Sequence, residues 1–148
     1  DEVLWRRMLA VNLTGTMRMC VAAKPLLAKS GNAAIVNTAP MLSFVGGALV
    51  PAYAACEGGI AQLTKSLAIA WAADGIRVNA IAPGWISTEL TRGLTSDEAR
   101  SAAILARTPL KRWGEPADIG GSIVYLCSDA ARFVTGIVLP IDGGYAAM

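Results

Sequence analysis

The chain has 148 residues, of which 54% are hydrophobic and 16% are charged, and its formal net charge is +2. This composition predicts one compact folded domain and excludes a disordered chain, and the small net charge provides no basic footprint for nucleic acid. Because the sequence contains no histidine, a conventional Ser-His-Asp hydrolase and a histidine-ligated metal site are both excluded.

The first half of the chain alternates long helical patterns with a short apolar run. Apolar residues at helical spacing predict a long helix over residues 2–28, which a turn signal follows. Residues 33–38 form an apolar run that is typical of a buried parallel strand. We expect a glycine-containing loop over residues 40–49 and a second long helix over residues 51–73, capped by Gly75.

The second half continues this alternation with shorter elements. Residues 76–81 and 138–141 predict two further buried strands, and residues 117–127 predict a helix between them. The candidate N-cap residues of two short intervening helices are Ser87 and either Thr95 or Ser96. Helices that alternate with buried apolar strands predict an α/β fold with parallel strands and right-handed crossovers, in a single domain over residues 1–148.

The cysteine spacing and the hydropathy of the chain indicate in which cellular compartment the protein is expected. Cys20, Cys56 and Cys127 are too far apart to form a CxxC motif, so no zinc or redox site is expected, and sparse cysteines suit a reducing cytoplasm. We expect no membrane span because no run of about 18 apolar residues is present, and no signal peptide because the chain begins Asp1-Glu2. These signals predict a cytoplasmic protein without a metal, membrane or nucleic-acid partner.

Four separated segments carry recognisable motifs: LAVNLTGTMRM (9–19), AAIVNTAPMLSFVGG (33–47), YAACEGGIAQLTKSLAIAWAADGIRVNAIAPGWISTEL (53–90) and GSIVYLCSDAARFVTGIVLPIDGGYA (121–146). In order and spacing they resemble classical short-chain dehydrogenases/reductases, and together they cover essentially the whole chain. The resemblance implies a partial Rossmann-like, doubly wound parallel sheet. It would hold the family's last three strands with flanking helices, and the N-terminal nucleotide-binding half would be missing.

The family binds its nicotinamide cofactor, NAD or NADP, on a glycine-rich turn that follows the first strand. No such turn is present here, and the glycine pairs of this chain are interpreted as turns or close packing. These pairs are Gly46-Gly47, Gly58-Gly59, Gly120-Gly121 and Gly143-Gly144. Without the family's neighbouring central strand, the strand at residues 33–38 is expected to present an apolar edge.

The resemblance also implies a catalytic tetrad of Asn, Ser, Tyr and Lys. Asn12 matches the family's Asn, and Tyr53 matches its Tyr. Pro40 stands at the Ser position, and proline has neither a hydroxyl nor an N–H with which to polarise a carbonyl. Ser43 follows three residues later and would reach the site only if the loop were rebuilt. Glu57 stands at the Lys position, so two of the four positions contradict the mechanism.

Glu57 reverses the charge that the family places one helical turn after its Tyr. A phenol has an ordinary pKa of about 10, which the family lowers with the Lys ammonium group. A carboxylate instead raises the pKa of Tyr53, because like charge disfavours the phenolate. Lys65 lies about 120° round the same helix from Tyr53 and cannot replace the missing cation.

A further motif, Pro83-Gly84-Trp85-Ile86-Ser87-Thr88, resembles the family segment that contacts the cofactor. The resemblance implies that Pro83, Gly84, Ile86 and Thr88 bind the nicotinamide end, with the Thr on phosphate. Residues 88–108 resemble the segment that covers the substrate. Candidates for an apolar substrate pocket, or alternatively for the core, are Met41, Phe44, Trp85 and Leu90.

Three functions remain open. The first is a short-chain dehydrogenase/reductase-like oxidoreductase with an impaired tetrad, which acts on a small alcohol or carbonyl compound. The second is a catalytically inactive oligomerisation or binding module. The third is a repurposed enzyme, such as a hydrolase that uses Ser43, Cys56 or Tyr53 with Glu57.

The low charge of the chain suggests that another subunit or missing chain covers part of its apolar surface. In the family, the two long helices pair across a two-fold axis. We therefore expect a homo-oligomer, a dimer or a tetramer, formed through residues 2–28 and 51–73.

Overall fold

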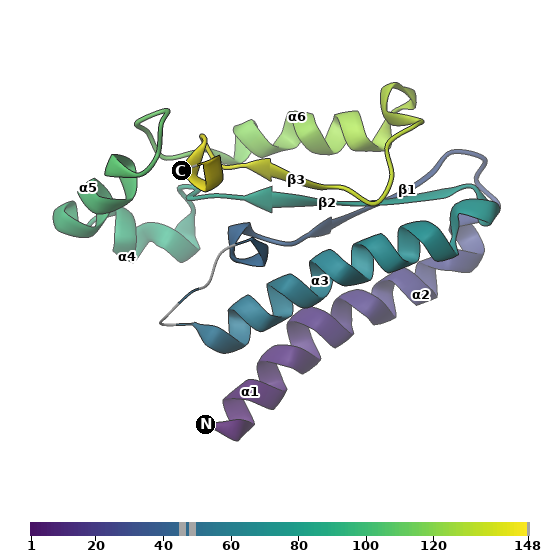
Figure 1. The fold of residues 1–148 in the computed structure, drawn as a ribbon, viewed down its shortest axis with the longest axis horizontal. Helices are drawn as coiled ribbons and strands as arrows, with labels where there is room; N and C mark the ends of the chain where they lie inside the picture. The colour runs from purple at the N-terminus through teal and green to yellow at the C-terminus, as the bar shows by residue number, and fades with distance from the viewer. Residues whose placement is uncertain (45–46, 48–49, 148) are drawn as a thin grey trace.

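The computed structural model describes residues 1–44, 47 and 50–147 and shows a three-stranded sheet between two helical layers (Figure 1). The strands β1 (Ala33–Thr38), β2 (Ile76–Pro83) and β3 (Val138–Ile141) are parallel and lie in the order β1-β2-β3. The predicted α/β fold with a parallel sheet is confirmed. Strand β2 continues to Pro83, beyond its predicted end at residue 81.

The first predicted helix is one rod built from α1 (Glu2–Met8), the π-helical segment η1 (Leu9–Thr14) and α2 (Gly15–Leu27). The prediction of one regular helix missed the π-helical segment. Two side-chain bonds involve its residue Asn12: Asn12 Nδ2 donates to the Met8 carbonyl of α1 at 3.1 Å, and the Thr16 hydroxyl donates to the Asn12 carbonyl at 2.6 Å. Single π-helical turns inside α-helices frequently occur at functional sites.

The second long helix, α3 (Pro51–Ala70), lies beside this rod on the same face of the sheet (Figure 1). The helix ends at Ala70 with Trp71 as its C-cap, earlier than the predicted end at residue 73. A 3₁₀ turn, η3 (Ala72–Asp74), follows, and Gly75 caps this turn with φ +69°. Helix α3 approaches η1 closely at Gly59, where an added Cβ would lie 2.8 Å from Leu13 Cδ2. The interpretation of this glycine as a close-packing position therefore agrees with the structure.

The opposite face of the sheet is covered by α6 (Pro116–Cys127), which confirms the helix predicted there (Figure 1). Two short helices, α4 (Arg92–Thr95) and α5 (Glu98–Ala106), lie beyond the carboxyl ends of the strands. Of the predicted loop, Met41–Ser43 forms a 3₁₀ turn, η2. Residues 45, 46, 48 and 49, which include part of the first glycine pair, lie outside the described residues.

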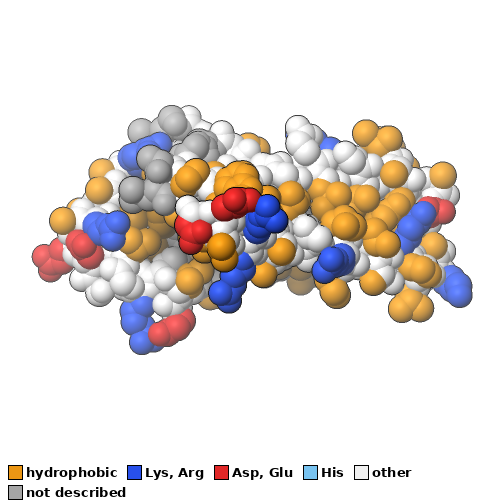
Figure 2. Space-filling model, turned by 90° about the horizontal axis from the view of Figure 1, so that it is seen from below, with side chains coloured by type: hydrophobic (Ala, Val, Ile, Leu, Met, Phe, Trp, Pro, Cys, Tyr) orange, Lys and Arg blue, Asp and Glu red, His pale blue; other side chains and the backbone are white. Residues whose placement is uncertain are grey.

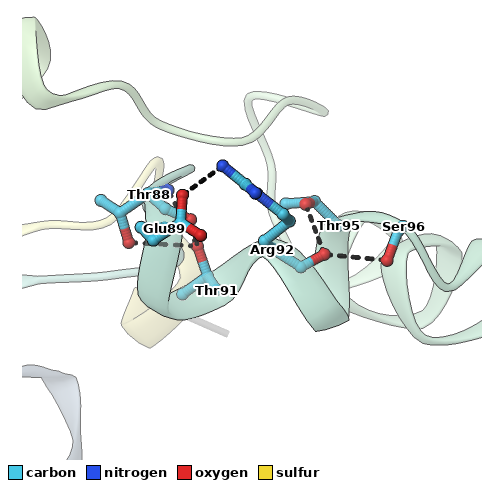
Figure 3. A network of polar contacts seen from close by, with 6 residues as sticks. All are labelled: Thr88, Glu89, Thr91, Arg92, Thr95 and Ser96. Atoms are coloured by element: carbon cyan, nitrogen blue, oxygen red, sulfur yellow. Dashed lines mark hydrogen bonds and ion pairs between the residues drawn. The ribbon is translucent and has the colours of Figure 1, made fainter.

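The predicted N-cap residues of the two short helices were wrong. Thr88, not Ser87, caps the turn η4 (Glu89–Thr91). The Ser87 N–H donates to the Gly114 carbonyl at 2.8 Å. Figure 3 shows this capping box, in which the Thr88 N–H donates to Thr91 Oγ1 at 2.9 Å.

Helix α5 is capped by Asp97, whose carboxylate accepts from the Arg100 N–H at 3.0 Å. The hydroxyls of Thr95 and Ser96 instead donate back to the Arg92 carbonyl, at 3.0 and 2.9 Å (Figure 3). Both hydroxyls therefore bond to the turn that precedes them, and Asp97 is the residue that caps α5.

The main core lies between the sheet and helices α2 and α3. Its buried members are Cys20, Ala33, Ala68, Trp71, Ile76 and Val78, and a second cluster joins Ala39, Ile60 and Ala80. Of the four pocket-or-core candidates, Met41 is buried and Trp85 half-buried, whereas Phe44 and Leu90 are exposed.

Large apolar side chains remain on the surface of the two long helices. In the view from below, apolar side chains gather over a broad area (Figure 2). The more exposed of those on the long helices are Val3, Leu4, Val11, Met19, Val21, Leu26 and Ile69. Among the described residues, no helix is long and apolar enough to cross a membrane.

A Gly84→Ala variant tests how closely the segment after β2 approaches the end of β3. An added Cβ at Gly84 would lie 2.6 Å from Asp142 Cα, a backbone atom that cannot move without shifting β3. We expect the substitution to lower the free energy of unfolding by about 1–3 kcal/mol, measured by urea denaturation.

The matched control is Gly120→Ala in α6, where an added Cβ meets no heavy atom within 4 Å. This change is expected to be neutral or to stabilise by up to about 1 kcal/mol, because alanine favours a helix over glycine. Equal effects at the two positions would contradict the close approach at Gly84.

Candidate functional site

A cavity of ≈ 650 Å³ opens between α2, α3 and the outer edge of β1. Asn12, Pro40, Tyr53 and Glu57, which match the four tetrad positions of the family, all line it. The structure thus brings together side chains that are up to 45 residues apart in the sequence. The same cavity exposes β1, which pairs with β2 alone among the described strands, so one edge of β1 is open as predicted.

Each wall residue is positioned by a different element. Asn12 belongs to the π-helical segment, and its amide group is held by the Met8 carbonyl. Pro40 follows β1 and caps the short turn η2. Tyr53 and Glu57 lie one turn apart on α3, so both side chains emerge on the same side of that helix.

The carboxyl group of Glu57 is deeply buried at this site. Its side chain is 2% exposed, and Oε2 is buried without a hydrogen-bond partner among the described residues. Burial raises the pKa of the Glu57 carboxyl from 4.5 to about 7, and the neighbouring Tyr53 hydroxyl offsets only part of this rise. The group is therefore divided between its neutral and charged forms near neutral pH.

Tyr53 is correspondingly a very weak acid. Burial raises the pKa of the Tyr53 phenol from 10.0 to about 12, and the Glu57 carboxylate adds to this rise. The direction expected from the sequence agrees with the structure, but the larger cause is burial, which the sequence did not reveal. At neutral pH the phenol keeps its proton, so it can donate a hydrogen bond or a proton and is a poor base.

Other candidates from the sequence lie outside this cavity. Ser43 does not line it, and its hydroxyl donates to the Ala39 carbonyl at 3.2 Å. Lys65 is exposed and does not line it either. Cys56 is fully buried, and burial raises the pKa of its thiol. Ser43 therefore does not face this cavity, and the buried Cys56 is not an activated thiol.

The four cofactor-binding candidates follow β2 at the carboxyl end of the sheet. Pro83 ends the strand, and Gly84 N–H donates to the Ile141 carbonyl at 3.0 Å. Ile86 forms a parallel bridge with Gly114 and lines a second cavity of ≈ 170 Å³. The Thr88 hydroxyl lies 3.3 Å from that of Thr91 and remains exposed (Figure 3).

The structure does not bring these candidates into the larger cavity. Pro83, Gly84 and Thr88 line neither cavity. They lie at the same end of the sheet as Pro40, because Thr38 at the end of β1 pairs with Ile81 of β2. Ligands of open α/β sheets bind at the carboxyl ends of the strands, so both groups of residues face the expected region.

Sequence reasoning missed an aromatic cluster at this end. Trp85 contacts Trp113 edge-to-face, with ring centroids 6.0 Å apart, and Tyr145 at 6.3 Å. The Arg107 guanidinium lies 4.4 Å from the Tyr145 ring. Nε1 of Trp85 is buried and has no partner among the described residues. These residues are far apart in the sequence, and no local pattern predicts their contact.

A buried polar chain next to the larger cavity was also missed. Cys20 Sγ lies 3.5 Å from Asn37 Oδ1, and Asn37 Nδ2 donates to Thr64 Oγ1 at 3.0 Å. This chain connects α2, β1 and α3 behind the cavity wall. In the described part of the chain, no group of three or more Cys, Asp or Glu side chains is arranged to hold a metal ion.

Comparisons with known proteins find similar sequences over nearly the whole chain. A family model described as enoyl-(acyl carrier protein) reductase matches residues 1–146. The 2-dehydro-3-deoxy-D-gluconate 5-dehydrogenase of Bacillus subtilis is 48% identical over 144 residues, which are 97% of this chain and 57% of that protein. The cis-4-hydroxycyclohexanecarboxylate dehydrogenase of Sinomonas cyclohexanicum is 42% identical over 148 residues, 100% of this chain and 59% of that protein.

A solved structure is also similar throughout. The gluconate 5-dehydrogenase of Burkholderia cenocepacia, in complex with NADP and tartrate, superimposes with a TM-score of 0.96 at 34% identity. The match covers 100% of this chain and 58% of that protein. The present chain thus spans a little under three fifths of the length of these relatives.

A Glu57→Gln variant separates the two causes of the high Tyr53 pKa. Removal of the carboxylate is expected to lower the phenol pKa below about 12, although not to its ordinary value, because burial persists. The measurement is the tyrosinate absorbance during a pH titration, with Tyr53→Phe subtracted to remove the other two tyrosines. An unchanged Tyr53 pKa would contradict the coupling to Glu57.

The raised Glu57 pKa also predicts how stability depends on pH. The native state binds the proton more tightly than the unfolded state, so the free energy of unfolding falls as pH rises from about 4.5 through about 7. Since each pKa unit is worth about 1.4 kcal/mol, the loss is on the order of 3 kcal/mol. Urea denaturation at several pH values measures it. Glu57→Gln should flatten this part of the profile, and an equally steep profile would refute the assignment.

Proposed function

Because the chain belongs to the short-chain dehydrogenase/reductase family, we propose that the whole protein is an oxidoreductase. It transfers a hydride between a nicotinamide cofactor, NAD or NADP, and a small alcohol or carbonyl substrate. The observation that supports this proposal is the placement of Asn12, Pro40, Tyr53 and Glu57 on one cavity, with the Pro83–Thr88 segment at the same end of the sheet.

The residues present fit the cofactor only in part. The exposed Thr88 hydroxyl and the Ile86 segment are free to contact its nicotinamide and phosphate groups. The cofactor supplies the hydride when bound. On the cavity wall, however, Glu57 offers a carboxylate where the family has a cation, and Pro40 offers no hydroxyl. We therefore derive from this chain's residues only what happens to the proton.

The proton chemistry favours reduction over oxidation. The Tyr53 phenol is protonated at neutral pH and can donate its proton to an oxygen that becomes negative as a carbonyl is reduced. In the opposite direction the phenolate is scarce, so removal of a proton from an alcohol is slow. Pro40 contributes no hydrogen bond to the substrate oxygen, and both directions lose that stabilisation.

A second function, an inactive binding or assembly module, is supported by the same two residues. Pro40 and Glu57 remove the hydroxyl and the cation of the tetrad while α1, α2 and α3 keep their exposed apolar faces. With or without catalysis, we propose a homo-oligomer through these helices, because an isologous helix interface can cover apolar surface of this kind. The free cysteines suit the proposed cytoplasmic location.

Titration of the purified chain with NADH and NADPH separately, followed by nicotinamide fluorescence, tests the proposal. We expect saturable binding of one cofactor and slow carbonyl reduction in a substrate screen that starts with hydroxy acids and their keto forms, as the names of the relatives suggest. Failure to bind either cofactor would overturn the oxidoreductase proposal for this chain and favour the assembly module.

A rescue variant sharpens this test. The double change Pro40→Ser and Glu57→Lys restores a hydroxyl and a cation, which should raise turnover roughly 100-fold or more, since a tuned acid-base group contributes about 10²–10⁴-fold. The gain should disappear when Tyr53→Phe is added. A double variant that binds the cofactor and reduces substrate no faster than the original chain would contradict the assigned roles of positions 40 and 57.

A further inference from the structure

Trp113 is joined to the segment after β2 by backbone bonds and by a ring contact. The N–H of the next residue, Gly114, donates to the Trp85 carbonyl at 2.9 Å, and the Ser87 N–H donates to the Gly114 carbonyl at 2.8 Å. The rings of Trp85 and Trp113 meet edge to face, with centroids 6.0 Å apart. These contacts fix the Trp113 indole relative to residues 85–87.

The same indole also bonds to α5. Trp113 Nε1 donates to the Ser101 hydroxyl at 2.9 Å, across 12 residues of chain. Both residues are half-buried, so water competes for this bond less than it would at an exposed site. In the described structure no residue of α5 is buried, which leaves little apolar packing to fix the helix. The bond between the indole and the hydroxyl is therefore important for the place of α5.

Other contacts hold the opposite end of α5. The Arg107 guanidinium, just after the helix, lies 4.4 Å from the Tyr145 ring. Lys111 Nζ donates to the Ala106 carbonyl at 2.9 Å. These contacts act on the C-terminal end of the helix, whereas Ser101 lies in its first half. The bond to Trp113 thus constrains a part of α5 that they do not reach.

The location of α5 gives this constraint a consequence. The helix lies beyond the carboxyl ends of the strands (Figure 1), where ligands of open α/β sheets bind. Residues 85–87 belong to the Pro83–Thr88 segment, which is proposed above to contact the cofactor. Trp113 therefore joins a helix and a segment that would both border a ligand in this region. Its contacts are all made within the described residues, so they do not depend on what covers the outer edge of β1.

We propose that Trp113 is a positioning residue, which holds α5 at a fixed place relative to residues 85–87 through its bond to Ser101. The importance of this place for the reaction rests on the proposed function, but the contact itself requires neither cofactor nor turnover. Substitutions that remove the bond should loosen α5 locally and leave the sheet and α6 intact, because segments of a protein can open separately.

Amide hydrogen exchange of the full chain without cofactor tests the proposal through the protection factors of α5. We expect Ser101→Ala to lower them roughly fivefold, because a hydrogen bond is lost. Ser101→Thr keeps the hydroxyl and should retain the original protection within about twofold, although threonine lowers helix propensity. Helix propensity alone predicts the opposite order, since alanine favours a helix and threonine disfavours it relative to serine.

Two further variants separate the bond from other effects. Trp113→Phe keeps an aromatic ring and loses the N–H, so it should lower the protection of α5 as Ser101→Ala does, and the two changes together should add nothing further. The matched control is Ser122→Ala in α6, whose hydroxyl has no bond among the described residues. This change should leave the protection of α6 unaltered or raise it.

Unchanged or higher protection of α5 in Ser101→Ala would overturn the proposal, and so would additive effects of the two single changes. An equal loss of protection in α6 would also overturn it, because the variant would then have lost global stability. Lowered protection confined to α5, in a chain that binds neither NADH nor NADPH, would support the role of Trp113 and remove only the proposed function.

Discussion

Backbone pairing holds β1 and β2 in parallel register from Ala33 opposite Ile76 to Thr38 opposite Ile81. This register places the ends of both strands side by side, so that Pro40 and the Pro83–Thr88 segment leave the sheet at the same edge. Helix α3 packs across the same strands and presents Tyr53 and Glu57 to the space beside β1. A shift of one residue between β1 and β2 would turn the buried side chains to the other face and separate these groups.

The carboxyl group of Glu57 affects two pKa values in this cavity, its own and that of Tyr53. Its burial raises its own pKa, and its charge adds to the already high pKa of Tyr53. A carboxylate at this position therefore disfavours the phenolate form of Tyr53.

Two exposed surfaces of the chain are relevant to the proposed homo-oligomer. The outer edge of β1 and the apolar faces of the long helices remain exposed in the described structure. An open strand edge and a large apolar helix face are both stabilised when another polypeptide covers them. The proposed homo-oligomer would cover the apolar faces of the helices.

Helical and strand periodicities are local properties, so the order and type of the main elements could be predicted from the residues alone. The residue types at positions 40 and 57 likewise show their chemistry directly, since proline has no hydroxyl and glutamate no positive charge. How deeply Glu57 is buried, and that Ser43 bonds to Ala39 rather than reaching the cavity, depend on contacts between distant segments.

The π-helical turn at Asn12 and the capping of the short helices by Thr88 and Asp97 also required the structure. In each of these cases several neighbouring groups could form the hydrogen bond. A periodicity pattern does not show which of them does. Burial and cavity shape arise where α2, α3 and β1 meet, and those segments are distant in the chain. For that reason the burial of Glu57 and its raised pKa were not predictable from the sequence.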